Sequence, residues 1–272
     1  MNKIFTTLAA AAFCAVLSAE IVQNPDPNAL WIENGKNIKT AAKQGDLIWG
    51  INGKIEVTTL DKGFKVGSGG NLGIYVPVSN QYPWLCYEIK SSERITSGYH
   101  AFSMNPALDI GVFSVVTKIP KGTYCIALDS SAKLKEKPRW NYMRLDIHNA
   151  NVILDYIGMF KEPPCALSLG KGLIKKGTNA NIVIKTKEPA EMVQLKFYKA
   201  YTMPAIQVIP NAKRYLAKPV DGKDNKEWTF SFPYNGFPGI DGKIGTVVIE
   251  AVVETKDDVH SYFFFNQVPF EK

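Results

Sequence analysis

Short apolar runs with a two-residue alternation dominate the chain from Trp31 onward, and this pattern constrains the fold more than any other feature. Gly, Asn, Asp and Pro break the runs about every eight to twelve residues, which is the spacing of an all-β sandwich. Successive side chains of a strand point to opposite faces, so each run can bury one face and expose the other. The sequence therefore predicts an all-β protein. A turn or two of helix is expected only around residues 37–43.

Candidate strands fall on both sides of a proline pair, Pro163-Pro164. Those before it lie at residues 54–59, 63–66, 73–78, 85–90, 111–118, 123–129, 143–148 and 152–160. Those after it lie at residues 168–174, 181–185, 192–198, 205–209, 228–232, 246–254 and 261–267. Consecutive prolines cannot donate to a strand ladder. We therefore expect two β-sandwich domains, at residues 20–163 and 164–272, and seven short strands in the second fit an immunoglobulin-like sandwich.

The first residues, MNKIFTTLAAAAFCAVLSAE, have the features of a secretory signal peptide. Lys3 precedes an apolar run, and the small residues Ser18 and Ala19 close it. We expect residues 1–19 to be removed and the mature protein to be secreted, periplasmic or on the cell surface. No later run reaches the ~18–20 apolar residues of a membrane-spanning helix.

The chain is mildly basic, with a formal net charge of +7 at pH 7. An excess of this size fits either an ordinary solvated surface or attraction to an acidic polysaccharide. The chain carries no nucleic-acid-binding motif, and export would place it in the wrong compartment for such a partner. We therefore expect no nucleic-acid partner.

Three cysteines, Cys86, Cys125 and Cys165, lie beyond the expected signal peptide, so one chain can form at most one bridge among them. Cys86 and Cys125 lie inside strand-like runs and could face each other across a sheet. Two buried free thiols fit the pattern equally well, because Cys packs as a small apolar side chain. The cysteine and histidine spacing does not indicate a zinc site.

The stretch MRLDIHNANVILDYIGMF, residues 143–160, concentrates the side chains best suited to chemistry. Its two alternating runs predict a β-hairpin. A turn at residues 149–150 would set Arg144 opposite Asp155, whereas a turn at 150–151 would set Asp146 opposite Asp155. Opposed carboxylates need a cation between them, so charge favours the first register.

Metal and catalytic roles in this stretch depend on that register. His148 ends its strand and is expected to be an ordinary surface residue. Asp155 is the better calcium candidate, since carboxylate and carbonyl oxygens suit a hard cation. Asp146 and Asp155 could serve a glycoside hydrolase or lyase only in the second register.

The run 145–160 resembles the closing strands of galactose-binding-like jelly-roll carbohydrate-binding modules, and residues 71–89 are similar to an earlier strand pair of these modules. The resemblance covers about residues 30–163 and implies that Asp155 helps to hold a structural calcium. The run 242–258 of the second domain resembles immunoglobulin-like or fibronectin-like modules. A galactose-binding-like jelly roll followed by an immunoglobulin-like domain is therefore the expected architecture.

Sugar-binding surfaces combine an aromatic face with a few polar groups. Leu85, Tyr87 and Ile89 share one face of their strand, which leaves Trp84, Cys86 and Glu88 on the other. Trp84 and Glu88 are therefore candidate ligand contacts, although packing of Trp84 inside the sandwich also fits. Trp140 and Tyr142 follow a basic loop and are further candidates.

These features predict an exported, non-catalytic protein that binds a polysaccharide or other glycan. The alternatives are a structural or protein-interaction module of an envelope or secreted assembly, and a small glycoside hydrolase or lyase. No catalytic motif such as G-x-S-x-G or H-E-x-x-H occurs. We expect no cofactor beyond the calcium that the resemblance implies.

Overall fold

The computed structural model describes residues 27–35, 48–51, 57–66, 71–77, 81–93, 99–104, 112–116, 121–127, 142–147, 151–163, 167–169, 172–199, 206–207, 215–237, 247–265 and 268–271. Several predicted features lie outside these residues: the signal peptide, the helical turn at 37–43, Trp140, His148 and Cys165. Within the described residues the protein is all-β, as predicted, and the structure shows no helix there. No helix in this part is long and apolar enough to cross a membrane.

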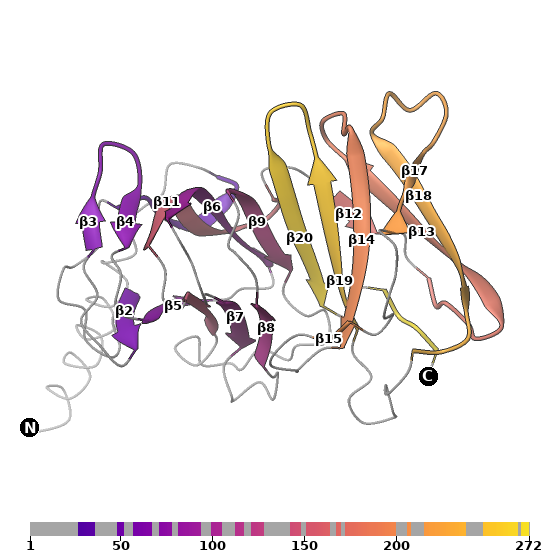
Figure 1. Ribbon diagram of the computed structural model, residues 1–272, viewed down its shortest axis with the longest axis horizontal. Helices are drawn as coiled ribbons and strands as arrows, with labels where there is room; N and C mark the ends of the chain where they lie inside the picture. The colour runs from indigo at the N-terminus through magenta and orange to yellow at the C-terminus, as the bar shows by residue number, and fades with distance from the viewer. Residues whose placement is uncertain are drawn as a thin grey trace, which may run out of the picture.

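The strands form three sheets (Figure 1). The long sheet has eleven strands, ordered β15 (Ile206–Gln207), β14 (Met192–Lys199), β19 (Val247–Glu254), β20 (Val259–Phe265), β9 (Gly122–Ala127), β6 (Trp84–Glu93), β11 (Asn151–Phe160), β4 (Phe64–Val66) and β3 (Val57–Thr59), with β1 (Ala29–Glu33) beside β11 and β16 (Tyr215–Leu216) beside β14. The five-stranded sheet is β2 (Ile48–Ile51), β5 (Asn71–Pro77), β10 (Tyr142–Ile147), β7 (Tyr99–Met104) and β8 (Val112–Val116). The four-stranded sheet is β12 (Leu167–Leu169), β13 (Thr178–Thr186), β18 (Glu227–Tyr234) and β17 (Lys218–Pro219).

The long sheet contains strands from both halves of the chain. β20 pairs with β9 in parallel, from His260 opposite Thr123 to Phe263 opposite Ile126. The other strand pairs of the described sheets are antiparallel. The predicted boundary at residue 163 stays a prediction, but the two halves share one hydrogen-bonded sheet.

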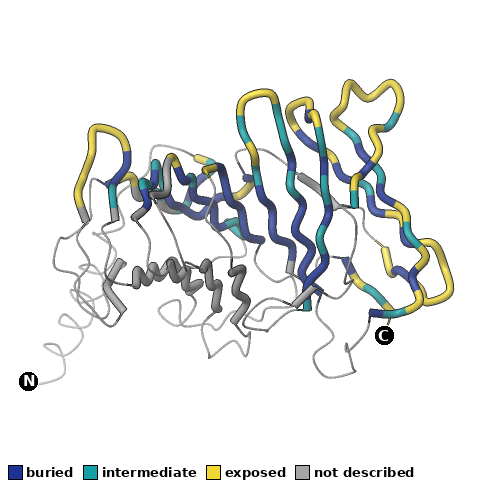
Figure 2. The backbone as a smooth tube through the Cα atoms, in the orientation of Figure 1, coloured by how far each residue is buried: buried dark blue, intermediate teal, exposed yellow. Residues whose placement is uncertain are grey.

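The two faces of the long sheet are covered by different partners. Leu85, Tyr87 and Ile89 of β6 are fully buried on one face, and the five-stranded sheet lies beneath this part in Figure 1. Cys86 and Cys125 are buried on the opposite face and belong to the core that includes β13 and β18 of the four-stranded sheet. Figure 2 shows that the central strands are buried while the hairpin tips are exposed.

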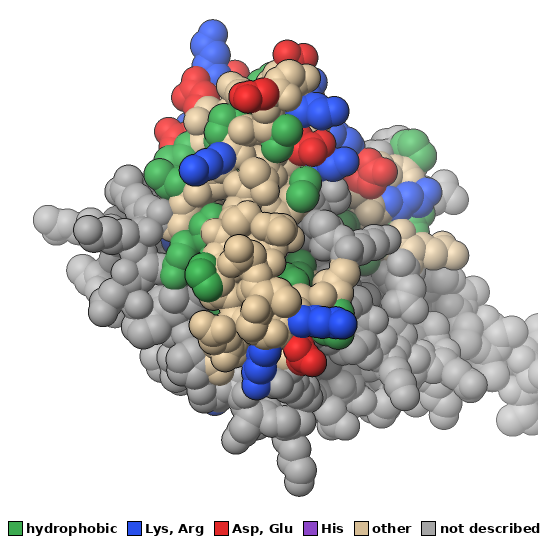
Figure 3. Space-filling model, turned by 90° about the vertical axis from the view of Figure 1, so that its right-hand side faces the viewer, with side chains coloured by type: hydrophobic (Ala, Val, Ile, Leu, Met, Phe, Trp, Pro, Cys, Tyr) green, Lys and Arg blue, Asp and Glu red, His purple; other side chains and the backbone are tan. Residues whose placement is uncertain are grey.

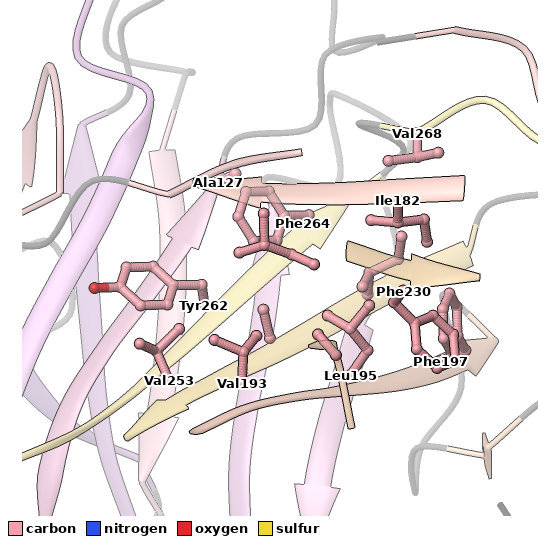
Figure 4. Close-up of a cluster of buried hydrophobic side chains, with 14 of the residues drawn as sticks. Ala127, Ile182, Val193, Leu195, Phe197, Phe230, Val253, Tyr262, Phe264 and Val268 are labelled. Carbon is pink, nitrogen blue, oxygen red and sulfur yellow. The ribbon is translucent and has the colours of Figure 1, made fainter. Parts of the chain in front are cut away.

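The core between the long sheet and the four-stranded sheet is a continuous cluster of aromatic and aliphatic side chains (Figure 4). Phe197 of β14 contacts Phe230 of β18 across the two layers, with ring centroids 6.2 Å apart. Trp228 and Phe230 of β18 are buried, and Phe232 packs against the same cluster. Burial of the apolar side chains of both layers is the main stabilising contribution.

The predicted hairpin at residues 143–160 is wrong. β10 pairs with β5 and β7 in the five-stranded sheet, whereas β11 pairs with β6, β4 and β1 in the long sheet. Asp146 lies opposite Gly73 and Ala101, so neither predicted register brings a residue of β10 to Asp155. The alternation identified two strands with one apolar face each, but strands in facing layers satisfy that pattern as well as strands side by side.

Candidate functional site

An open depression of about 680 Å³ lies on the long sheet, on the face that carries Cys86 and Cys125. It lies between the β3–β4 and β19–β20 hairpins, which both rise at the top of Figure 1. Its lining comes from both halves of the chain: Ile32, Asn34, Leu60, Asp61, Lys62, Gly63, Glu88, Thr123, Asp155, Tyr156, Phe160, Asp258 and His260.

The floor of the depression is one row of side chains across four strands. Tyr156 of β11 lies opposite Glu88 of β6, and Glu88 lies opposite Thr123 of β9. His260 of β20 continues the row beside Thr123 through the parallel pair. Residues directly opposite on adjacent strands point to the same face. The sheet register therefore brings these four side chains together without help from the loops.

Two β-bulges shape the floor beside this row. The β6–β11 register shifts twice, so that Lys90 and Asp155 each have no opposite residue in the ladder. Lys90 Nζ lies 2.5 Å from Glu88 Oε1 and 3.6 Å from Asp155 Oδ2. Bulges redirect side chains in this way beside functional sites. The result is a Glu–Lys–Asp cluster in which one ammonium group contacts two carboxylates and offsets part of their charge.

The β3–β4 hairpin forms one wall through a close approach to β11. Gly63 has a φ of +76°, and a Cβ at this position would overlap the carbonyl oxygen of Leu154. The turn is closed by the hydrogen bond that the Leu60 N–H donates to the Gly63 carbonyl, at 3.1 Å. Only glycine accepts this φ without strain and leaves room for the neighbouring backbone. Gly63 therefore allows the β3–β4 hairpin to pack directly against the bulged part of β11.

The β19–β20 hairpin supplies Asp258 to the opposite wall. The Asp258 carboxylate accepts a hydrogen bond of 2.8 Å from the Val259 N–H. The Asp258 N–H donates to Thr255 Oγ1 at 3.2 Å, and the Asp258 carbonyl accepts from the Thr255 N–H at 2.9 Å. These bonds fix the turn and hold the Asp258 side chain at the rim of the depression.

The lining is acidic although the whole chain is basic. It includes four carboxylates, at Asp61, Glu88, Asp155 and Asp258, and one ammonium group, at Lys62. Lys90, beside the lining, adds a second positive charge, so the carboxylates still outnumber the ammonium groups. The hydrogen bond to Glu88 raises the pKa of Lys90, which keeps this neighbouring residue charged. An anionic ligand would meet repulsion here, so the depression favours neutral or cationic ligands.

His260 is the one imidazole in this lining. Burial lowers its pKa, while Asp258 and Glu88 act in the opposite direction. Its Nδ1 is buried and has no hydrogen-bond partner among the described residues. A neutral imidazole that offers one donor and one acceptor can bind a hydroxyl group.

Of the four residues predicted to contact ligand, Glu88 lies in the depression. Trp84 shares its strand face but packs edge-on against Tyr262 and Phe264, with ring centroids 6.4 and 5.3 Å away. Tyr142 begins β10, opposite Pro77 in the five-stranded sheet. Trp140 lies outside the described residues. Of the two whose side chains the structure describes, Glu88 lines the depression and Trp84 does not.

Asp155, predicted as a calcium ligand, also lines the depression, where Lys90 is its ion-pair partner. Within the described part of the chain, no group of three or more His, Cys, Asp or Glu side chains is arranged to hold a metal ion. The calcium assignment therefore stays a prediction, and Lys90 is the group that a cation would have to displace.

Sequence reasoning missed Thr123, Tyr156, Asp258 and His260. Tyr156 was visible as part of an alternating strand, and Asp258 as part of the polar turn KDD. The positions of Thr123 and His260 follow from the parallel β9–β20 pair. Pairing between strands so distant in sequence leaves no local pattern in either strand.

Comparisons with known proteins do not identify a family. No family model and no curated protein matches the sequence. Among solved structures, the M1 domain from titin is 12% identical, covers 39% of this chain and 95% of its own, and has a TM-score of 0.22. The I9–I11 tandem from titin is 9% identical, covers 74% of this chain and 60% of its own, and has a TM-score of 0.21. TM-scores this low do not indicate a shared fold or function.

Proposed function

We propose that the chain is an exported, non-catalytic glycan-binding protein and that the depression between the two hairpins is its binding site. The observation that carries this proposal is the row Tyr156, Glu88, Thr123 and His260, a set of polar groups on an open floor. Sugar sites use such hydrogen-bonding groups for the hydroxyls and an aromatic ring for the apolar face. Tyr156 and Phe160 are the aromatic residues in the lining.

The acidic lining narrows the class of glycan. Because four carboxylates face the depression, we propose that it takes a neutral or amine-bearing glycan. The acidic polysaccharide that the basic net charge suggested would be repelled at this site. If acidic glycans bind at all, they would bind to another surface.

Export is supported by the sequence of residues 1–19. A secreted, periplasmic or cell-surface location would give the protein access to polysaccharide. Mass spectrometry of the protein recovered from outside the cytoplasm tests this point. We expect a mass without residues 1–19, and recovery of the intact chain from the cytoplasm would contradict export.

A glycan array followed by calorimetric titration tests the proposed site. We expect Glu88→Gln to weaken binding at least about tenfold, because a hydrogen bond to a charged group is worth ~1.5–3 kcal/mol. We expect Tyr156→Ala to weaken binding as well, because it removes an aromatic ring from the lining. The matched control is Glu227→Gln, since Glu227 pairs with Lys185 at 3.4 Å on the four-stranded sheet, away from the depression. Figure 3 faces the side of the molecule that carries the four-stranded sheet, and acidic and basic side chains lie close together in its upper part.

Unchanged glycan affinity in both site variants would show that the depression is not the glycan-binding site. Trp140→Ala and Tyr142→Ala would then test the other predicted contacts. No binding to any neutral, amine-bearing or acidic glycan, together with capture of a protein partner by the full chain, would favour the protein-interaction alternative.

A further inference from the structure

Cys86 and Cys125 lie directly opposite each other on the antiparallel strands β6 and β9. The ladder runs without a shift from Trp84 opposite Ala127 to Ile89 opposite Gly122, so the register at the cysteines is firmly set. Opposed residues of antiparallel strands have Cα atoms about 4.5–5.5 Å apart. A disulfide spans Cα atoms about 4.4–6.8 Å apart. The backbone therefore already has a spacing that a bridge accepts.

We propose that Cys86 and Cys125 form a cross-strand disulfide when the chain folds in an oxidising compartment. Both residues are free and fully buried thiols in the structure. Their side chains share one face, so bridging requires no exchange of strands or faces. The inference rests on the proposed export for its compartment and does not depend on glycan binding.

The bridge would lie next to the floor of the depression, on the same face of the sheet. Glu88 is two residues after Cys86 on the same face of β6, and Thr123 is two residues before Cys125 on the same face of β9. Glu88 and Thr123 are themselves opposite each other. A covalent link one step along the ladder would therefore fix the spacing of two floor residues of the proposed site.

The oxidant is a low-molecular-mass or protein disulfide, and the step is two thiol–disulfide exchanges. The first cysteine thiolate attacks a sulfur of the oxidant, forms a mixed disulfide and releases one thiolate, which takes up a proton. The second cysteine then attacks the first cysteine's sulfur, forms the Cys86–Cys125 bond and expels the second thiol. The two protein thiols are oxidised and the oxidant disulfide is reduced to two thiols.

Burial restricts when this reaction can occur. The thiolate is the attacking form, and burial is the largest cause of the raised pKa of Cys125. Neither thiol is exposed to an external disulfide in the folded protein. The bridge must therefore form while β6 and β9 are still accessible, before the four-stranded sheet covers this face.

Refolding of the full chain tests the proposal. The denatured, reduced protein is refolded with oxidised glutathione, alkylated in denaturant without a reductant, and digested for peptide mass mapping. We expect a linked peptide pair containing Cys86 and Cys125 in most molecules, and also in a Cys14→Ser/Cys165→Ser variant. Alkylation of both Cys86 and Cys125 in most molecules would overturn the proposal.

A second measurement tests the role of burial. The folded, reduced protein is exposed to the same oxidant, and bridge formation is followed by the same mapping. We expect formation at least about tenfold slower than during refolding, and equal rates would overturn the folding-coupled step. The oxidant is supplied in both experiments, so a failure of the bridge is distinguishable from a failure of the proposed export.

Discussion

His260 on β20 lies directly beside Thr123 on β9, in a parallel strand pair that joins the C-terminal and N-terminal halves of the chain. This contact places the imidazole in the same row as Glu88 and Tyr156. The candidate site is therefore a product of the shared sheet, since neither half alone provides the whole row. Pockets commonly form where two structural units meet.

The junction between the halves depends on Gly122. Its φ is +146°, and a Cβ there would overlap the carbonyl oxygen of Val259 at the start of β20. The matched control is Gly172, whose φ is +154° and whose Cβ would meet open space. We expect Gly122→Ala to lower the free energy of unfolding by ~1–3 kcal/mol more than Gly172→Ala does, because only Gly122→Ala adds a steric overlap. Equal losses in chemical denaturation would show that the β9–β20 contact tolerates the extra atom.

The wall formed by the β3–β4 hairpin depends on Gly63 in the same way. We expect Gly63→Ala to push the hairpin away from β11 and to weaken glycan binding as well as stability. Gly222→Ala is the control, because Gly222 has a nearly equal φ of +72° with no neighbour at the Cβ position. Calorimetric titration of both variants measures the effect. The proposed wall would be wrong if both variants bound glycan as tightly as the wild type.

The strands of this site were largely predictable from the sequence, but their partners were not. Alternation placed Trp84, Cys86 and Glu88 on one face of β6 correctly, because strand geometry alone determines which side chains share a face. The assignment of β10 and β11 to different sheets was missed, since the alternation of apolar residues in the two sequences fits either arrangement. Bulges at Lys90 and Asp155 also leave no clear pattern in the sequence. Glu88 and Asp155 were therefore identified individually, whereas the site that joins them was not.

His260 makes the stability of the protein depend on pH. Burial lowers the pKa of this histidine in the folded protein, below its ordinary value of about 6.5. Above pH 6.5 the imidazole is neutral in both states, and its contribution to stability is fully present. As the pH falls through the lowered pKa, the unfolded chain binds the proton first, so this contribution is lost.

A His260→Gln variant measures that contribution. We expect its free energy of unfolding to fall less between pH 7.5 and pH 5 than the wild-type value falls, since the other titrating groups are common to both proteins. A proton NMR titration of His260 gives the pKa directly. An identical pH dependence in the two proteins, or a pKa of His260 above 6.5, would contradict this account.

Lys90 is the group that a divalent cation would have to displace at Asp155. Its ammonium group contacts Glu88 and Asp155 and occupies the position between two potential ligands. We expect Lys90→Gln to bind Ca²⁺ more tightly than the wild type, because removal of the ammonium group leaves two carboxylates without their cation. Calorimetric titration with CaCl₂ measures the difference. Wild-type binding that is equal or tighter would show that calcium binds without displacing Lys90.

Amide hydrogen exchange, measured with and without the oligosaccharide that binds best on the array, tests the central claim most directly. We predict slower exchange in the ligand complex for peptides that cover residues 59–63, 86–90, 122–125, 154–157 and 257–261, which contain most of the residues that line the depression. Protection confined to other parts of the chain, with these five segments unchanged, would contradict a glycan site between the two hairpins.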